Sequence, residues 1–310
     1  MLKDGLDFSC KSLNEIIDFL KSRQVEKLEI SPSNLKVCED GNILFLRTMN
    51  GHIKDYPIRR AFLYKLLKWF QFPVNQILNL SIETIAYICN DFLMNIRSDK
   101  VYIKVENGDA LTILSKKYNE ITDQEILNMI SEIGISEISR NDFFMSVNTE
   151  EKYRIKPFPG DDFGIGLNIL NSETGFRALT VNQFIFRYIC SNGAYTSITD
   201  NKDNRRFHYG SDNLRQFVVD KIEIAKQKKE HILNKIIALN NEKFDDEILM
   251  KIKSEVNRVL GKNKTDEFFA DVDLTSTRYE LFNHITQRAK QFNLSKRYFL
   301  ESLAGEMLLN

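Results

Sequence analysis

The sequence has few of the features that mark secreted, zinc-binding or membrane proteins. Its four cysteines, Cys10, Cys38, Cys89 and Cys190, form no Cys-x-x-Cys pair and have no histidine at zinc-ligand spacing. This scatter indicates neither a disulfide framework nor a zinc site, and favours reduced thiols. No apolar run approaches the roughly 18 residues of a transmembrane helix, and the first residues lack the apolar core of a signal peptide. We therefore expect a cytoplasmic protein without a membrane partner.

An excess of charge of one sign is also missing. The 43 Lys and Arg residues balance 43 Asp and Glu residues, so the formal net charge is zero at pH 7. No global field then attracts nucleic acid or anionic lipid, and any such surface must be local. The 310 residues, 43% of them hydrophobic, are enough for one large domain or two small ones.

Familiar catalytic motifs are absent as well. The sequence has no Gly-x-x-x-x-Gly-Lys-Ser/Thr loop, no Gly-x-Ser-x-Gly elbow and no His-Glu-x-x-His helix. The glycines between residues 160 and 166 lead into a strand pattern, whereas a phosphate-binding loop would open a helix. The four histidines, His52, His208, His231 and His284, are dispersed. We predict no cofactor or metal and assign no catalytic residue.

Hydrophobic periodicity predicts an α+β protein, with a central mixed, mostly antiparallel sheet, flanking helices and a helical C-terminal third. We expect helices at residues 13–20, 59–70, 81–95, 214–239, 247–260 and 279–290, and one beginning near Ser295. Strands are expected at residues 27–30, 35–37, 43–47, 143–147, 153–156, 163–170 and 176–181. The expected units are a helix-plus-hairpin segment at 1–55, an α+β core at 56–210 and a helical region at 211–310. The alternative is that the helical region and the core form one continuous domain.

Two local signals are sharper than the rest. Residues 101–105 and 110–114 alternate around Asn107-Gly108, a dipeptide typical of a two-residue β-hairpin turn. Thr122 is followed three residues later by Glu125, the spacing of a capping box at a helix start. We expect that helix to stop near Gly134, and linkers at 240–243 and 261–264.

The most specific segments are Asn-Ser-Glu-Thr-Gly at 171–175 and Arg-Tyr-Ile-Cys-Ser-Asn-Gly at 187–193. With residues 59–67, 72–73, 114–118, 206–208 and 279–283 in the same order, they resemble a family of phage and plasmid proteins known as domain of unknown function 932. The resemblance covers about residues 55 to 310, and Thr174 stands where the family more often has an aliphatic residue. It implies bacteriophages and plasmids, and hence a bacterial host, as the setting, without implying a chemistry.

The 171–175 segment lies between two expected strands and favours a tight turn, because Asn171 and Gly175 tolerate positive φ. In a second interpretation, Ser172 and Glu173 contact a ligand or coordinate a divalent ion from a rigid turn. Arg187 lies in an apolar run, where its charge must either reach solvent or meet a partner, such as the carboxylate of Glu173 or a phosphate. Asn192 and Gly193 suit a helix C-cap or a turn.

A basic segment at 202–229 holds eight cationic and four anionic residues. Cations beside aromatic rings are typical of single-stranded nucleic-acid sites, in which bases stack and phosphates are neutralised. The competing interpretation is a solvated helix face after a polar loop. The residues predicted to bind nucleic acid are Arg205, Arg206, Phe207, His208, Tyr209, Arg215 and Lys221.

Three functions remain open at this point. The first is a DNA-binding protein of a phage or mobile element that acts in replication or recombination, binding or annealing single-stranded DNA and forming a homo-oligomer. The second is a metal-dependent enzyme acting on nucleic acid through Glu173, Asp161, Asp162 or His284. The third is a protein-interaction module that blocks a host defence factor with its long helices.

Overall fold

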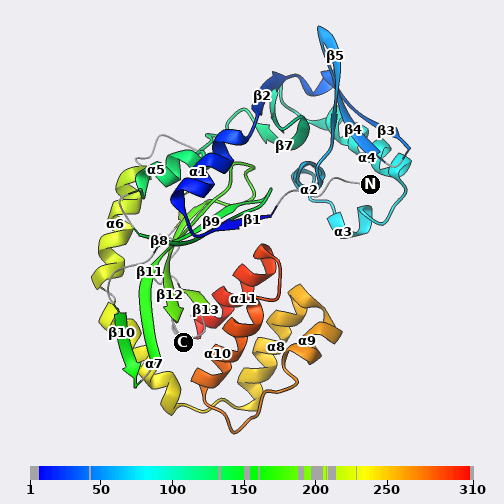
Figure 1. Ribbon diagram of the computed structural model, residues 1–310. Helices are drawn as coiled ribbons and strands as arrows, with labels where there is room; N and C mark the ends of the chain where they lie inside the picture. The colour runs from blue at the N-terminus through cyan, green and yellow to red at the C-terminus, as the bar shows by residue number, and fades with distance from the viewer. Residues whose placement is uncertain are drawn as a thin grey trace.

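The computed structural model describes residues 7–41, 43–131, 134–149, 154–159, 161–187, 192–196, 205–206, 208, 214–227 and 229–307. Its described strands form three antiparallel sheets, and helices make up the C-terminal third (Figure 1). The predicted α+β class is confirmed. Within the described residues no helix is long and apolar enough to cross a membrane.

The largest sheet has the order β1-β8-β9-β11-β12-β13, with β10 paired to β11 and β14 paired to β12. Its strands are β1 (Phe8–Cys10), β8 (Ile135–Arg140), β9 (Met145–Thr149), β10 (Arg154–Phe158), β11 (Asp161–Asn171), β12 (Leu179–Arg187), β13 (Asn192–Thr196) and β14 (Arg205–Arg206). The β11–β12 hairpin is its centre, since Phe163 pairs with Arg187 at one end and Leu170 with Thr180 at the other. Asn192 pairs with Arg187 at the start of β13, so of the two alternatives for Asn192 and Gly193 the helix C-cap is wrong.

Two smaller sheets form an N-terminal lobe, drawn at the upper right of Figure 1. One contains β2 (Val25–Ile30), β6 (Val101–Glu106) and β7 (Asp109–Ser115), and the other contains β3 (Leu35–Asp40), β4 (Ile43–Asn50) and β5 (His52–Pro57). The lobe's helices are η1 (Pro32–Asn34), α2 (Arg60–Trp69), α3 (Val74–Ile77) and α4 (Ile82–Asn95). The β6–β7 turn has Asn107 at φ 52° and Gly108 at φ 83°, which confirms the predicted hairpin.

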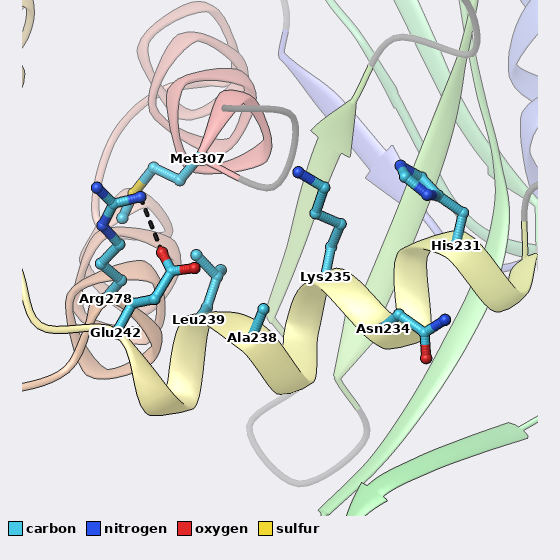
Figure 2. A pocket seen from close by; sticks show the side chains of 8 residues that line it. All are labelled: His231, Asn234, Lys235, Ala238, Leu239, Glu242, Arg278 and Met307. Atoms are coloured by element: carbon cyan, nitrogen blue, oxygen red, sulfur yellow. Dashed lines mark ion pairs between the residues drawn. The ribbon is translucent and has the colours of Figure 1, made fainter.

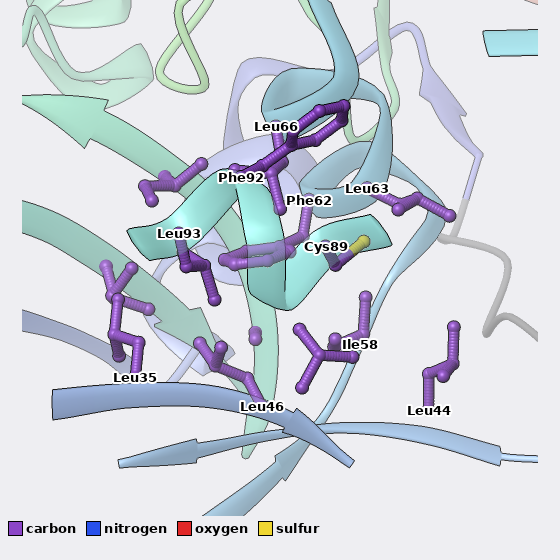
Figure 3. Close-up of a cluster of buried hydrophobic side chains, with 14 of the residues drawn as sticks. Leu35, Leu44, Leu46, Ile58, Phe62, Leu63, Leu66, Cys89, Phe92 and Leu93 are labelled. Atoms are coloured by element: carbon purple, nitrogen blue, oxygen red, sulfur yellow. The ribbon is translucent and has the colours of Figure 1, made fainter. Parts of the chain in front are cut away.

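One apolar cluster fills this lobe (Figure 3). It joins Leu46 of β4 to Phe62 and Leu66 of α2 and to Leu93 of α4, all almost fully buried. The cluster therefore crosses the boundary expected after residue 55. Burial also raises the pKa of the Cys89 thiol in this cluster to about 12.

Helices cover the large sheet from several directions. They are α1 (Leu13–Ser22), α5 (Asp123–Met129), α6 (Leu214–Gln227), α7 (Lys229–Asn241), α8 (Asp246–Leu260), α9 (Lys262–Phe268), α10 (Arg278–Ala289) and α11 (Leu294–Glu306). Near the β11–β12 turn, Leu167 and Val181 pack with Ile16 of α1 and Phe217 of α6. Toward the other end of the hairpin, Phe163 and α7 to α11 form a second apolar cluster.

The sequence predictions fail mainly at short elements. Strands β1 and β8 and helix α9 were not expected, and residues 261–264, expected as a linker, lie largely in α9. The capping box at Thr122 and Glu125 is present, although α5 ends at Met129, earlier than expected. Cys10, Cys38 and Cys89 are free thiols, as predicted, and Cys190 lies outside the described residues.

Candidate nucleic-acid interface

The predicted turn at residues 171–175 is present, but it is buried between the large sheet and the N-terminal lobe. Gly175 has φ 72°, and its amide donates to the carbonyl of Ser172 over 3.2 Å. Ser172 is fully buried, and its hydroxyl donates to the carbonyl of Phe143 over 2.6 Å. In this arrangement Ser172 holds the turn in place and does not face a ligand.

Glu173 is the anion at the centre of this turn. Its Oε2 lies 2.7 Å from Arg23 and 2.7 Å from Lys104, and its Oε1 accepts from the amide of Asp123 over 2.8 Å. Burial alone would raise the pKa of Glu173, but Lys104, Arg23 and Arg140 outweigh it and hold that pKa well below its usual range. Both carboxylate oxygens are thus occupied by protein groups, which leaves no support for Glu173 as a metal ligand.

Arg187 does not pair with Glu173, and that prediction is wrong. Arg187 pairs with Phe163 at the far end of the hairpin, seven residues along the strand from Leu170. At about 3.4 Å per residue, Arg187 and Glu173 are more than about 20 Å apart. The guanidinium of Arg187 is half-buried and lies 5.7 Å from the ring centroid of Tyr279 in α10.

A buried ion-pair network surrounds Glu173; we call it the junction network. Its cations, at the meeting of lobe and sheet, are Arg23, Arg59, Lys104 and Arg140, and its carboxyl groups are Glu106, Asp109, Glu120, Asp123, Asp142 and Glu173. The carboxyl groups outnumber these cations, although Lys27 adds a partly exposed contact to Glu120. Burial and the charge of Glu173 together raise the pKa of Asp123 to about 6.

A pocket of about 320 Å³ lies next to the turn, on the side of α2. It is lined by Lys65, Lys68, Trp69, Leu114, Ser115, Tyr118, Gly175 and Phe176, with no carboxylate among them. Lys65 and Lys68 lie over the same ring, 5.2 Å and 5.4 Å from the centroid of Phe176. Trp69 is one-third exposed, and the chain between Ser115 and Tyr118 carries two exposed lysines.

Lys65 occupies the inner part of this pocket. Its Nζ donates to the carbonyl of Gly175 over 2.6 Å, and a Cβ added to Gly175 would lie 2.8 Å from that nitrogen. Burial, and then the neighbouring charge of Lys68, lower the pKa of Lys65 to about 8. No carboxylate lines the pocket in the described part of the chain, so an anion bound there would offset both effects by supplying the opposite charge.

The predicted basic segment reaches the same region in part. His208 stacks on Tyr118 with ring centroids 5.0 Å apart, and its Nε2 donates to the carbonyl of Arg177 over 3.1 Å. Arg205 is exposed on β14, opposite Thr180. Of these predicted residues, His208 thus lies close to the turn, and Tyr118, which also lines the pocket, joins it to that pocket.

Other members of the segment have different positions. Arg206 lies over the ring of Phe217, 4.6 Å from its centroid, and Lys221 lies over the same ring and is only 6% exposed. A buried Lys221 does not suit contact with a nucleic-acid strand. Phe207 and Tyr209 lie outside the described residues, as do the side chains of Arg215 and Asn192.

The groups proposed for metal chemistry are not brought together. Asp162 lies at the start of β11, at the far end of the hairpin from Glu173. His284 is in α10, where its Nε2 donates to the carbonyl of Phe268 over 2.6 Å, and the side chain of Asp161 is outside the described part. In the ranges that the structure describes, no three His, Cys, Asp or Glu side chains form a group that could hold a metal ion.

A second pocket, of about 220 Å³, lies between α7, α10 and the end of α11 (Figure 2). Lys235 and His231 project from α7 on its open side, while Arg278 and Glu242 form an ion pair 3.0 Å long. The apolar side chains in its lining are those of Ala238, Leu239 and Met307. His231 is the one ring in its lining, so this pocket offers a base less stacking surface than the pocket beside the turn.

Comparison of the chain with protein-family models, curated proteins and solved structures finds no match. The resemblance of residues 55 to 310 to the phage and plasmid family therefore stays a prediction.

Sequence reasoning missed most of the residues around the turn. In β6, Val101, Ile103 and Val105 alternate with Lys104 and Glu106, a pattern that assigns the charged face to solvent. The turn covers that face, so Lys104 and Glu106 are buried. The pocket lysines had one local signal: Lys65 and Lys68 are three residues apart, and hence share a helix face.

Proposed function

We propose that this protein binds single-stranded nucleic acid, with DNA favoured, through the pocket beside the 171–175 turn. The observation that carries the proposal is the lining of that pocket, where two lysines alternate with aromatic rings and no carboxylate neutralises them. Sites for single strands combine cations that follow the phosphates with rings on which the bases stack. The setting that the family resemblance implies is replication or recombination of a phage or mobile element.

The roles of the side chains follow from their exposure. Lys68 is exposed and Lys65 is half-buried behind it, so the two present positive charge at the mouth and the wall of the pocket. Trp69 and Phe176 offer partly exposed rings for stacking. Arg205 and the two lysines between Ser115 and Tyr118 extend the positive charge along the surface, which a strand longer than one nucleotide requires.

The test is a fluorescence-anisotropy titration with a single-stranded oligonucleotide at several salt concentrations. Affinity should fall with salt, with a log–log slope of about 0.7 for each phosphate neutralised. Lys65→Gln with Lys68→Ala should lower the slope by roughly one to two units. Trp69→Ala should weaken binding by about 1–3 kcal/mol and leave the slope nearly unchanged.

A matched control is Lys262→Ala with Lys264→Ala, because both lysines are exposed on α9, away from the pocket. This double variant removes the same charge and should bind like the wild type. Absence of binding to single- and double-stranded oligonucleotides at low salt would overturn the proposal and favour the protein-interaction module. Equal losses in the pocket and control variants would show unspecific attraction instead.

A further inference from the structure

Arg177 follows the turn directly and is held in an unusual environment. Its guanidinium carbon lies 4.6 Å from the ring centroid of Phe144 and 4.9 Å from that of Tyr298. The two rings are 6.0 Å apart and steeply inclined, and Asn182 donates to the Tyr298 hydroxyl over 2.8 Å. Arg177 is therefore packed against two rings that are themselves fixed by their neighbours.

No carboxylate accompanies Arg177 among the residues that the structure describes. Arg177 is half-buried, whereas Arg59 and Arg140 are buried and each contact at least two carboxylates in the junction network. Burial lowers the pKa of Arg177, and the nearby charge of Arg205 acts in the same direction. A half-buried guanidinium has lost part of its hydration, and an anion at its exposed side would offset that loss.

The backbone at Arg177 is fixed as well. Its carbonyl accepts from His208 Nε2, and His208 stacks on Tyr118, whose hydroxyl donates to the carbonyl of Ser172 over 2.7 Å. Burial lowers the pKa of His208, so this imidazole is neutral at pH 7. The guanidinium is thus held in one place before any ligand arrives, which reduces the entropy lost on binding.

We propose that Arg177, together with Arg205, binds a phosphate group. A guanidinium presents its donors in a planar fork that matches phosphate oxygens, and two neighbouring arginines favour an anion of higher charge than a carboxylate. The inference rests on the proposed function for the source of that phosphate, a nucleic-acid strand that passes from the Lys65 pocket toward β14. Arg177 would then be a second contact point for the strand, in addition to Lys65 and Lys68.

Stability measurements separate a ligand-binding arginine from a structural one. Arg177→Met keeps an unbranched side chain over both rings and removes the charge. In phosphate-free buffer this variant should melt close to the wild-type temperature, since the thioether keeps contacts with both rings and a half-buried charge without a carboxylate is gone. A fall in the melting temperature as large as that of a junction-network variant such as Glu173→Ala would show a structural partner and overturn the proposal.

Inorganic phosphate is the probe for the site itself. The wild-type melting temperature should rise by about 2 °C for each tenfold increase of phosphate above the dissociation constant. The rise should disappear in Arg177→Met and shrink in Arg205→Met, but persist in the control Arg97→Met, which alters an exposed arginine after α4. No phosphate-dependent rise in the wild type, at constant ionic strength, would refute the site.

An oligonucleotide with a 5′-phosphate, measured by anisotropy, distinguishes the two possible sources of phosphate. Weaker oligonucleotide binding by Arg177→Met, by about tenfold, supports the strand as ligand. A phosphate-dependent rise without any oligonucleotide binding would keep the phosphate site and remove the nucleic-acid function. Unchanged oligonucleotide binding in Arg177→Met would keep that function and remove Arg177 from it.

Discussion

The two ends of the β11–β12 hairpin are held by opposite kinds of interaction. At the turn end, Glu173 is fixed by the junction network, in which the side chains are almost fully buried ions. At the other end, Phe163 and Ile165 pack into the apolar layer of α7, α10 and α11. Apolar burial gives stability without direction, whereas buried ions give a fixed geometry and depend on pH. The end that carries the candidate site is the one whose geometry is fixed by charges.

The largest expected effect at the ionic end belongs to Glu173→Ala. It leaves Arg23 and Lys104 buried without their shared carboxylate, which should lower the free energy of unfolding by about 3–5 kcal/mol. Urea denaturation at pH 7 measures this loss. Glu39→Ala, at an exposed position of β3, is the control and should change stability by less than about 0.5 kcal/mol. A small loss in Glu173→Ala would show that the junction network is dispensable for folding.

At the apolar end, Leu300→Ala tests the contribution of apolar burial. Leu300 is fully buried in the cluster around α10 and α11, so removal of its side chain should cost about 2–5 kcal/mol. Unlike the loss in Glu173→Ala, this loss should stay constant between pH 4 and pH 8. Thermal unfolding followed by circular dichroism at several pH values makes the comparison. A strong pH dependence in Leu300→Ala would contradict the contrast between the two ends.

The pH dependence of the unfolding free energy in Asp123→Asn tests the ionic end more specifically. The pKa of Asp123 is raised to about 6 in the folded protein, above the roughly 3.9 of an unfolded chain, so the folded state binds its proton more tightly. Its contribution to stability is complete below the unfolded pKa and is lost as pH rises through about 6. Asn imitates the protonated form, so the variant should gain about 1–3 kcal/mol over wild type at pH 8 and nothing at pH 4.

The pKa of Glu173 is shifted in the opposite direction, downward, so the pH dependence of its contribution to stability is a check on that of Asp123. Its lowered pKa means that its contribution is present above the unfolded pKa of about 4.3 and is lost as pH falls toward the folded value. The difference in unfolding free energy between wild type and Glu173→Gln should therefore shrink in acid. A gain in Asp123→Asn at pH 4 as large as at pH 8 would contradict the assignment of the raised pKa to Asp123.

The smallest expected effect is that of Arg187→Ala. Arg187 is half-buried and lies against Tyr279. The change removes the contact between its guanidinium and that ring, which should lower the free energy of unfolding by about 0.5–2 kcal/mol. The loss should be well below that of Glu173→Ala when both are measured in urea. A loss equal to that of Glu173→Ala would mean that Arg187 belongs to a buried ion pair after all.

Much of the fold follows from local sequence. The Asn107-Gly108 hairpin and the Thr122 capping box were predicted because both depend on residues within a few positions of each other. The helices α2, α4, α8 and α10 begin and end within a few residues of their expected positions, since each has an apolar face of period 3.6. The short strand β1 escaped prediction, because three residues show no period and its pairing partner β8 is far along the chain.

The candidate site was predicted only in pieces. Sequence singled out Glu173, Gly175, Arg205 and His208. The structure places the first two in the turn, His208 beside it against Tyr118, and Arg205 opposite Thr180. It could not find the partners Arg23 and Lys104 of Glu173, which are 150 and 69 positions away. The choice of Arg187 as the partner failed because closeness in sequence places the two residues at opposite ends of one hairpin.

The sequence by itself determined the class of fold, the turn at 171–175 and the need for a partner at each buried charge. Turn chemistry, periodicity and desolvation are properties of short segments and single groups, so they can be recognised from the sequence alone. Tertiary structure decided which partner each charge found, giving Glu173 two cations and Arg177 two aromatic rings. Coulomb attraction falls with distance through space and not along the chain, and only the packing of the lobe on the sheet sets those distances.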